Sequence, residues 1–169
     1  FIRNALADIE PADIDNVYIS RTRFGGKGGI INEQRLERLL EAEGYTAVYR
    51  TNAHTRHGEH GNAMLSRWPV EAHQHEDMSD HRFEQRGLLH SEVLVHGVAL
   101  HVVVVHLGLI KASRVRQLAQ LQKFIAREIP EQAPLVVAGD FNDWGTTVQS
   151  ALGKAGLSAF TQQKAATFP

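Results

Sequence analysis

The sequence contains no cysteine, and none of its apolar runs approaches the length of a membrane span. Without cysteine there is no disulfide scaffold, no thiol nucleophile and no cysteine-based zinc site. A membrane-spanning helix needs about 20 consecutive apolar residues, so the sequence does not predict an integral membrane protein. The lack of cysteine fits a reducing compartment, and we expect a cytoplasmic protein.

An excess of charge of either sign is also missing. Lysine and arginine number 18, aspartate and glutamate 19, and the formal net charge is −1. Non-specific binding of nucleic acid depends mainly on neutralising phosphates, so this balance argues against affinity based on bulk positive charge. An enzyme that contacts a few phosphates is still allowed. The 169 residues, of which 43% are hydrophobic, predict a single globular domain over residues 1–169.

The apolar pattern predicts strands that alternate with helices, which is the signature of an α/β fold. Helices are expected over residues 1–10, 33–43, 113–129 and 148–155, and strands over 16–20, 45–49, 63–65, 87–94, 98–105 and 135–138. The turn His96-Gly97 predicts a hairpin, and the valines at 102–105 predict a strand buried on both faces. Ser113 is the expected cap of the long helix, whose apolar stripe starts at Val115. Residues 50–61 are polar and are expected to form a loop.

Two polar side chains follow the buried strand that ends at Gly139. Asp140 and Asn142 are two residues apart, so in extended geometry they point to one face. A carboxylate there can hold a divalent cation or orient a water molecule, and a carboxamide can donate to a phosphoryl oxygen. An ordinary Asp/Asn turn is the alternative interpretation, because both residues are common in turns.

His106 occupies the corresponding position at the end of the valine-rich strand. Its imidazole has a pKa near neutrality and can act as a general acid toward a leaving oxygen. A packing role is the equally weighted alternative. His101 lies five residues earlier, at the other end of the strand, and we interpret it as structural.

Asn62 and Arg86 each precede an apolar strand and are candidates for the same edge. A guanidinium suits forked contacts with phosphate, so we interpret Arg86 as functional and Arg67 as a packing or surface residue. No His-x-x-x-His pair falls on a predicted helix, so solvated loops are favoured over a metal site for a further set of histidines: His54, His57, His60, His73, His75 and His81. The glycine-rich stretch 25–29 is interpreted as a loop, either a substrate flap or plain surface.

Taken together and in order, five sequence blocks resemble the endonuclease/exonuclease/phosphatase superfamily. They are G-N-A-M-L-S-R-W-P at 61–69, E-Q-R-G-L-L at 84–89, H-V-V-V-V-H-L-G-L at 101–109, P-L-V-V-A-G-D-F-N-D-W at 134–144 and T-F-P at 167–169. The resemblance implies a four-layer α/β sandwich, in which two packed mixed sheets are flanked by helices. It also implies Mg²⁺-dependent hydrolysis of a phosphodiester, with Mn²⁺ as an alternative ion.

Carried over by position, the resemblance assigns a role to each candidate. Asp140 would bind the metal and orient the nucleophile, Asn142 would bind the phosphoryl oxygen, and His106 would assist the leaving group. Asn62 and Arg86 would support the phosphate site. The substrate would be a phosphodiester, with nucleic acid and a phospholipid headgroup as the two candidate sources.

The sequence departs from the family pattern near its start. Ala12-Asp13-Ile14 begins a strand in which the family carries a glutamate that binds the metal, but Ile19 stands where that glutamate belongs. Either residues are missing between Ile14 and Asp15 or the ligand is lost, and we expect missing residues. We also expect the terminal strands to be absent, since the family continues beyond T-F-P. These departures support a second hypothesis, a non-catalytic member that binds a phosphate ligand or a partner.

Overall fold

The structure is a computed structural model that describes residues 2–3, 42–56 and 58–159. In chain order its elements are β1 (Ile2–Arg3), β2 (Thr46–Thr55), β3 (Gly58–Ser66), β4 (Val70–Asp77), β5 (Gly87–Val95), β6 (Val98–His106), α2 (Lys111–Glu128), β7 (Leu135–Asp140) and α3 (Thr147–Lys154). A five-stranded sheet has the order β1-β7-β6-β5-β4, and β2 pairs with β3 in a two-stranded sheet. The predicted α/β class is confirmed.

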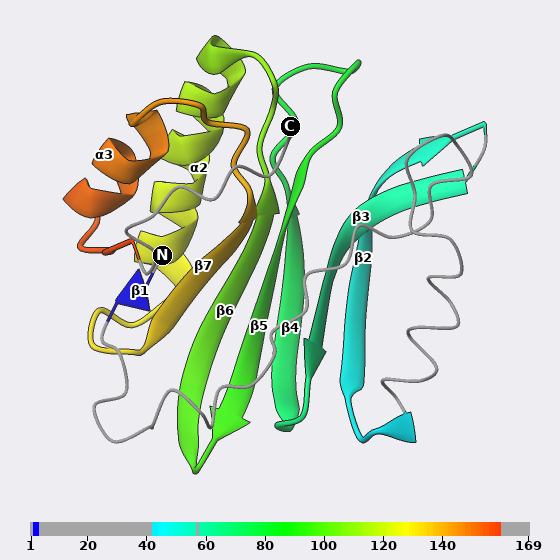
Figure 1. Cartoon of the computed structure of the whole chain (residues 1–169), viewed down its shortest axis with the longest axis vertical. Helices are drawn as coiled ribbons and strands as arrows, with labels where there is room; N and C mark the ends of the chain where they lie inside the picture. The colour runs from blue at the N-terminus through cyan, green and yellow to red at the C-terminus, as the bar shows by residue number, and fades with distance from the viewer. Residues whose placement is uncertain (1, 4–41, 57, 160–169) are drawn as a thin grey trace.

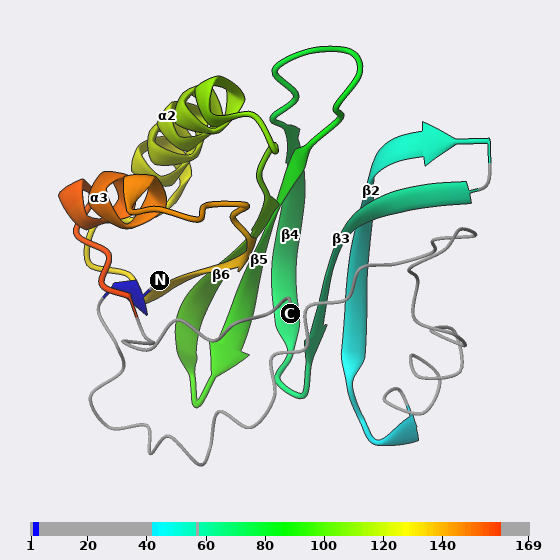
Figure 2. The same ribbon diagram turned by 45° about the horizontal axis from the view of Figure 1, so that its top comes forward.

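The two sheets pack face to face, and helices cover the outer face of the larger one. Figures 1 and 2 show α2 and α3 on one side of the large sheet and the β2–β3 pair on the other. The large sheet is mixed, as predicted, because β6 and β7 are parallel and its other pairs antiparallel. The described strands of the small sheet are antiparallel. The second helical layer of the predicted sandwich stays a prediction, because nearly all of the helix expected at 33–43 falls outside the described residues.

Strand β6 is buried on both faces, which confirms the interpretation of its valine run. Val103 and Val105 belong to the core beneath the helices. Val102 and Val104 belong to the core between the sheets. The alternation follows from the period of two in a strand, and each face faces its own apolar layer.

The hairpin between β5 and β6 also forms where the sequence places it. His96 and Gly97 both have positive φ, at 48° and 82°. A two-residue turn with this geometry matches the right-handed twist of the paired strands. The hairpin therefore fixes the register of β5 against β6 up to the pair Leu88–Val105, next to His106.

Helix α2 connects β6 to the parallel strand β7, and so brings the carboxyl ends of both strands to one edge of the sheet. Its start differs from the prediction. The helix begins at Lys111, Ile110 is at the cap position without a side-chain bond, and the Ser113 hydroxyl donates to Asp80 at 2.7 Å. Val115 is 49% exposed, so the buried stripe of the helix begins elsewhere.

The N-terminal prediction is wrong at the two residues that the structure describes. Ile2 and Arg3 were expected in a helix but form β1, which pairs antiparallel with β7. Backbone pairing at the edge of the sheet outweighs a short apolar spacing pattern. The expected strand at 16–20, the glycine-rich loop and the Ile14–Asp15 junction lie outside the described residues, as does nearly all of the helix at 33–43.

The polar segments hold more strand than their composition predicts. Residues 50–61, expected as a loop, form most of the β2–β3 hairpin, and β4 was not predicted at all. Six of the eight β4 residues are exposed, so the strand lacks the alternating burial that marks a half-buried strand. Histidines expected in loops therefore lie on strands: His54 on β2, His60 on β3, and His73 and His75 on β4. No helix in the described part of the chain combines the length and apolar character that crossing a membrane requires.

Candidate functional site

His106 and Asp140 end the two parallel strands and are directly paired in the register of the sheet. Their side chains therefore leave the sheet on the same face. His106 Nε2 lies 3.8 Å from an oxygen of the Asp140 carboxylate, and the two side chains are 24% and 41% exposed. This places a titratable imidazole beside a carboxylate that solvent reaches.

Asn142 joins this pair through a turn rather than by extended geometry. The residue has a φ of 48°, and its backbone N–H donates to Asp140 Oδ1 at 3.0 Å. Its side-chain amide donates to the Leu107 carbonyl at 2.7 Å, one residue beyond His106. The backbone therefore forms the Asp/Asn turn of the alternative interpretation. This turn places the Asn142 amide against the residue that follows His106. We call His106, Asp140 and Asn142 the strand-end cluster.

Gly139 makes the approach of β7 to β6 possible. Its φ is +139°, a conformation that side chains rarely adopt. A Cβ at this position would collide with the Val105 carbonyl oxygen. Glycine therefore sets the spacing between the two strands immediately before Asp140, since it alone lacks the clashing atom.

Asn62 lies beneath this edge and connects the two sheets. It is 4% exposed, and its side-chain amide donates to the Gly87 carbonyl at 2.7 Å and to the Val104 carbonyl at 3.1 Å. These bonds tie β3 to the ends of β5 and β6. The structure thus places Asn62 at the end of the sheet where β6 finishes, with backbone carbonyls as the partners of its amide.

Arg86 also lies at this end, just before β5, with its guanidinium held by the protein. Its Nη2 donates to Glu84 at 3.0 Å, and its side chain is 12% exposed. The Ser79 hydroxyl accepts from the Arg86 backbone N–H at 2.9 Å. Arg86 is therefore fixed within the segment between β4 and β5, and its carboxylate partner was not assigned a role from the sequence.

A second polar pair spans the two sheets close by. His75 on β4 is hydrogen bonded to Asn52 on β2 at 2.9 Å. The two side chains occupy the space that a Cβ on Gly87 would fill. Burial lowers the pKa of His75, the nearby Asp77 opposes this shift, and Arg50 adds to it. Sequence reasoning missed this pair, because a cross-sheet contact between two polar segments leaves no local pattern.

Comparisons with known proteins agree with the architecture. The model of the Endonuclease/Exonuclease/phosphatase family matches residues 22–162. The uncharacterized protein YbhP of Escherichia coli K12 is 43% identical over 129 residues, which cover 72% of this chain and 51% of YbhP. The chain thus spans about half the length of the curated relatives it matches.

Solved structures share the fold at low identity. Sphingomyelinase C from Streptomyces griseocarneus has a TM-score of 0.62 and 19% identity, covering 89% of this chain and 60% of that one. The human nocturnin catalytic domain with bound sulfate also has a TM-score of 0.62, with 16% identity, and covers 82% and 56% of the two chains. At these identities the likeness concerns the fold.

Proposed function

The chain belongs to the endonuclease/exonuclease/phosphatase family, and from this premise we propose that it hydrolyses phosphodiesters at the strand-end cluster. One observation carries the proposal. The imidazole of His106 and the carboxylate of Asp140 lie 3.8 Å apart at the paired ends of two parallel strands, where solvent reaches both. The carboxyl ends of such strands are the usual place for a ligand in an α/β sheet.

Each member of the cluster has a distinct task in the proposed reaction. Asp140 orients the water whose oxygen attacks phosphorus and accepts its proton as the new O–P bond forms. His106, as the imidazolium, gives a proton to the leaving oxygen when the ester bond breaks. The Asn142 amide bonds the Leu107 carbonyl through one N–H, and a carboxamide has a second N–H to donate to a phosphoryl oxygen.

Asp140 is also the residue that would hold a divalent cation such as Mg²⁺. Among the described residues, no group of three or more acidic or histidine side chains is gathered for a metal. Mg²⁺ is commonly held by one or two carboxylates, with water and substrate phosphate completing its shell, so the part-exposed Asp140 fits this role. When bound, the ion would polarise the phosphoryl oxygen. Mn²⁺ is the alternative ion.

The substrate is proposed to be a small phosphodiester or a phospholipid headgroup rather than long nucleic acid. The net charge of −1 offers no broad positive field for a nucleic-acid backbone. One structure of the same fold is named a sphingomyelinase, and another holds a sulfate, an anion with the tetrahedral shape of phosphate. Asn62 and Arg86 would support the phosphate site from below and from the side, through the contacts that fix them.

Hydrolysis of bis(4-nitrophenyl) phosphate with Mg²⁺ tests the proposal. We expect Asp140→Asn to lower kcat about 1,000-fold. The matched control is Asp143→Asn in the same loop. Asp143 accepts from the Val148 N–H at 2.8 Å, and asparagine can keep that bond, so kcat should stay within about threefold.

The competing hypothesis is a non-catalytic module that binds phosphate. It predicts no hydrolysis with any divalent ion, yet a rise in melting temperature on adding phosphate that Asp140→Asn does not affect. That pair of results would contradict the proposed function. Loss of activity with EDTA and its return with Mg²⁺ would support it.

A further inference from the structure

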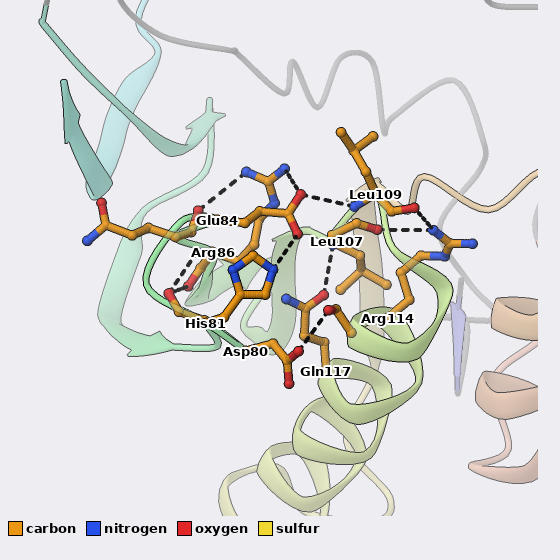
Figure 3. A network of polar contacts seen from close by, with 12 residues as sticks. Asp80, His81, Glu84, Arg86, Leu107, Leu109, Arg114 and Gln117 are labelled. Carbon is orange, nitrogen blue, oxygen red and sulfur yellow. Dashed lines mark hydrogen bonds and ion pairs between the residues drawn. The ribbon is translucent and has the colours of Figure 1, made fainter. Parts of the chain in front are cut away.

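The segment between β4 and β5, residues 78–86, carries a carboxylate that reaches two parts of the molecule at once. Glu84 Oε1 accepts from Arg86 Nη2 and from the Leu109 backbone N–H, each at 3.0 Å. The Glu84 and Arg86 side chains are 14% and 12% exposed. Figure 3 shows Glu84 between the guanidinium and the backbone of Leu109. Two hydrogen bonds to one largely buried carboxylate oxygen fix the orientation of the Glu84 side chain relative to both donors.

Leu109 belongs to the loop that follows His106. Side chains of α2 also form hydrogen bonds with the backbone of this loop. Gln117, which is fully buried, accepts from the Gly108 N–H at 2.8 Å. Arg114 donates to the Gly108 and Leu109 carbonyls at 3.2 and 2.6 Å. The backbone of residues 107–110 is thus held by α2 on one side and by Glu84 on the other (Figure 3).

The fit between Glu84 and this loop leaves no spare room. A Cβ at Gly108 would lie 2.6 Å from Glu84 Oε2 and 3.3 Å from Gln117 Oε1. The first of these distances is shorter than real Cβ contacts. The carboxylate therefore packs directly against the loop backbone, in the space that a side chain at residue 108 would need.

The same loop contacts the strand-end cluster. The Leu107 N–H donates to the Asp140 carbonyl at 2.9 Å, and the Leu107 carbonyl accepts the Asn142 amide at 2.7 Å. A continuous chain of bonded groups therefore runs from Arg86 through Glu84 and the loop to Asn142. His106 is the last residue of β6 and directly precedes this loop.

From these contacts we propose that Glu84 is a positioning residue of the phosphodiester site, fixing Arg86 and the 107–110 loop together and thereby the placement of His106 and Asn142. The proposal rests on the proposed function of the strand-end cluster. Glu84 itself does not touch substrate in this scheme. Its effect on the reaction passes through the loop.

Asp80 provides a matched control on the same segment. Its carboxylate accepts from the Ser113 hydroxyl at 2.7 Å and from Arg116 at 2.5 and 2.6 Å. These partners belong to α2 and not to the loop. Asp80→Asn therefore removes a charge that anchors the segment, while the Glu84 contacts are kept.

The test compares Glu84→Gln with Asp80→Asn in the full chain, well below their melting temperatures. We expect Glu84→Gln to lower kcat at least about tenfold with KM within about threefold, and Asp80→Asn to change neither. On a His106→Asn background, Glu84→Gln should have almost no further effect, because both changes disturb one unit. Glu84→Asp keeps the charge on a shorter stem. It should fall between wild type and Glu84→Gln, and it replaces that variant if glutamine prevents folding.

Equal kcat for the Glu84→Gln and Asp80→Asn variants would overturn the proposal, as would full additivity with His106→Asn. A second readout does not need activity. The imidazole signals of His106 in NMR spectra should move in Glu84→Gln and stay in place in Asp80→Asn. If the wild-type chain hydrolyses no phosphodiester, the proposed function fails. Unmoved His106 signals in Glu84→Gln would then reject the positioning role, and moved signals would support it.

Discussion

Two histidines on strand β6 have opposite surroundings. His106, at the carboxyl end, is partly exposed, and its partner at 3.8 Å is the carboxylate of Asp140. His101, near the other end, is 6% exposed. Its partner is His90, whose Nε2 lies 3.0 Å from His101 Nδ1, with the two rings stacked at 5.2 Å. The two residues are of the same type, but they lie on opposite faces of the sheet, differ in exposure and have different partners.

The difference separates a buried position from a partly exposed one along a single strand. His90 and His101 lie beneath α2, where the Phe124 ring meets His90 edge-on at 5.6 Å. Burial lowers the pKa of His90, and the neighbouring His101 lowers it further. A neutral pair that shares one N–H···N bond suits a core. An imidazole beside a carboxylate at a strand end suits proton transfer.

Replacing each histidine by asparagine tests most directly whether the two residues have different roles. His106→Asn should lower kcat on the order of 100- to 10,000-fold, because the proposed general acid is lost, and leave the melting temperature nearly unchanged. His101→Asn should do the reverse, with a loss of about 1–3 kcal/mol in the free energy of unfolding and an unchanged kcat. Steady-state kinetics and urea unfolding measure both. A loss of kcat in both variants would remove the distinction.

A second test asks whether the close approach of the two strand ends builds the cluster. Gly139→Ala should lower the free energy of unfolding by about 3 kcal/mol, because it adds both a clash with the Val105 carbonyl and an unfavourable φ. Gly97→Ala is the control, since Gly97 also has a positive φ but nothing lies within 4 Å of its Cβ position. It should cost only the backbone strain, about 1 kcal/mol. Equal losses in urea unfolding would show that strain, not contact, dominates at Gly139.

A third test separates the turn at Asn142 from the hydrogen bond that its amide makes just beyond the end of β6. Both Asn142→Ala and Asn142→Gly remove the amide that bonds the Leu107 carbonyl. Alanine at a φ of 48° adds backbone strain, so it should be less stable than glycine by about 1 kcal/mol. Both variants should lose kcat to a similar extent if the amide contacts the phosphoryl group. Activity retained in Asn142→Gly would restrict this residue to the turn.

The smallest expected effect concerns the buried pair and pH. Because the pKa of His90 is lowered by folding from the ordinary value of 6.5, the unfolded chain takes up a proton first as the pH falls. Its contribution to stability is complete above that value and is lost on acidification below it, by up to about 1.4 kcal/mol for each unit of lowering. His90→Gln should flatten the decline between about pH 7.5 and 5.5 in urea unfolding. His54→Gln, at a side chain 82% exposed, should not.

The sequence predicted the structure correctly where a local residue pattern has a single physical cause. The valines of β6 predict burial on both faces, and the His96–Gly97 pair predicts the hairpin turn, because both signals are local. That His106 and Asp140 meet follows from parallel strands ending at one edge. Strand β4 was missed because its exposed residues show no alternation, and its evidence lies in pairing with β5.

Within the candidate site, the unpredicted parts are the long-range ones. Glu84 bonds a backbone N–H 25 residues further along the chain, and Asn62 bonds carbonyls 25 and 42 residues away. No spacing rule connects such partners. Gln117 could have been singled out from the sequence. It is a polar residue on the face of α2 that is otherwise mostly apolar and buried, and Arg114 lies on the same face.

The placement of the two tryptophans gives the protein a built-in optical probe. Trp68 lies against the His96 ring at 4.5 Å, beside the turn that precedes β6. Trp144 stands two residues beyond Asn142 and is 79% exposed. These are the sole indole emitters of the chain. In a Trp68→Phe background, the remaining indole fluorescence, excited at wavelengths that tyrosine absorbs little, comes from Trp144 beside the candidate site. Quenching or a spectral shift would then report ligand entry without a label.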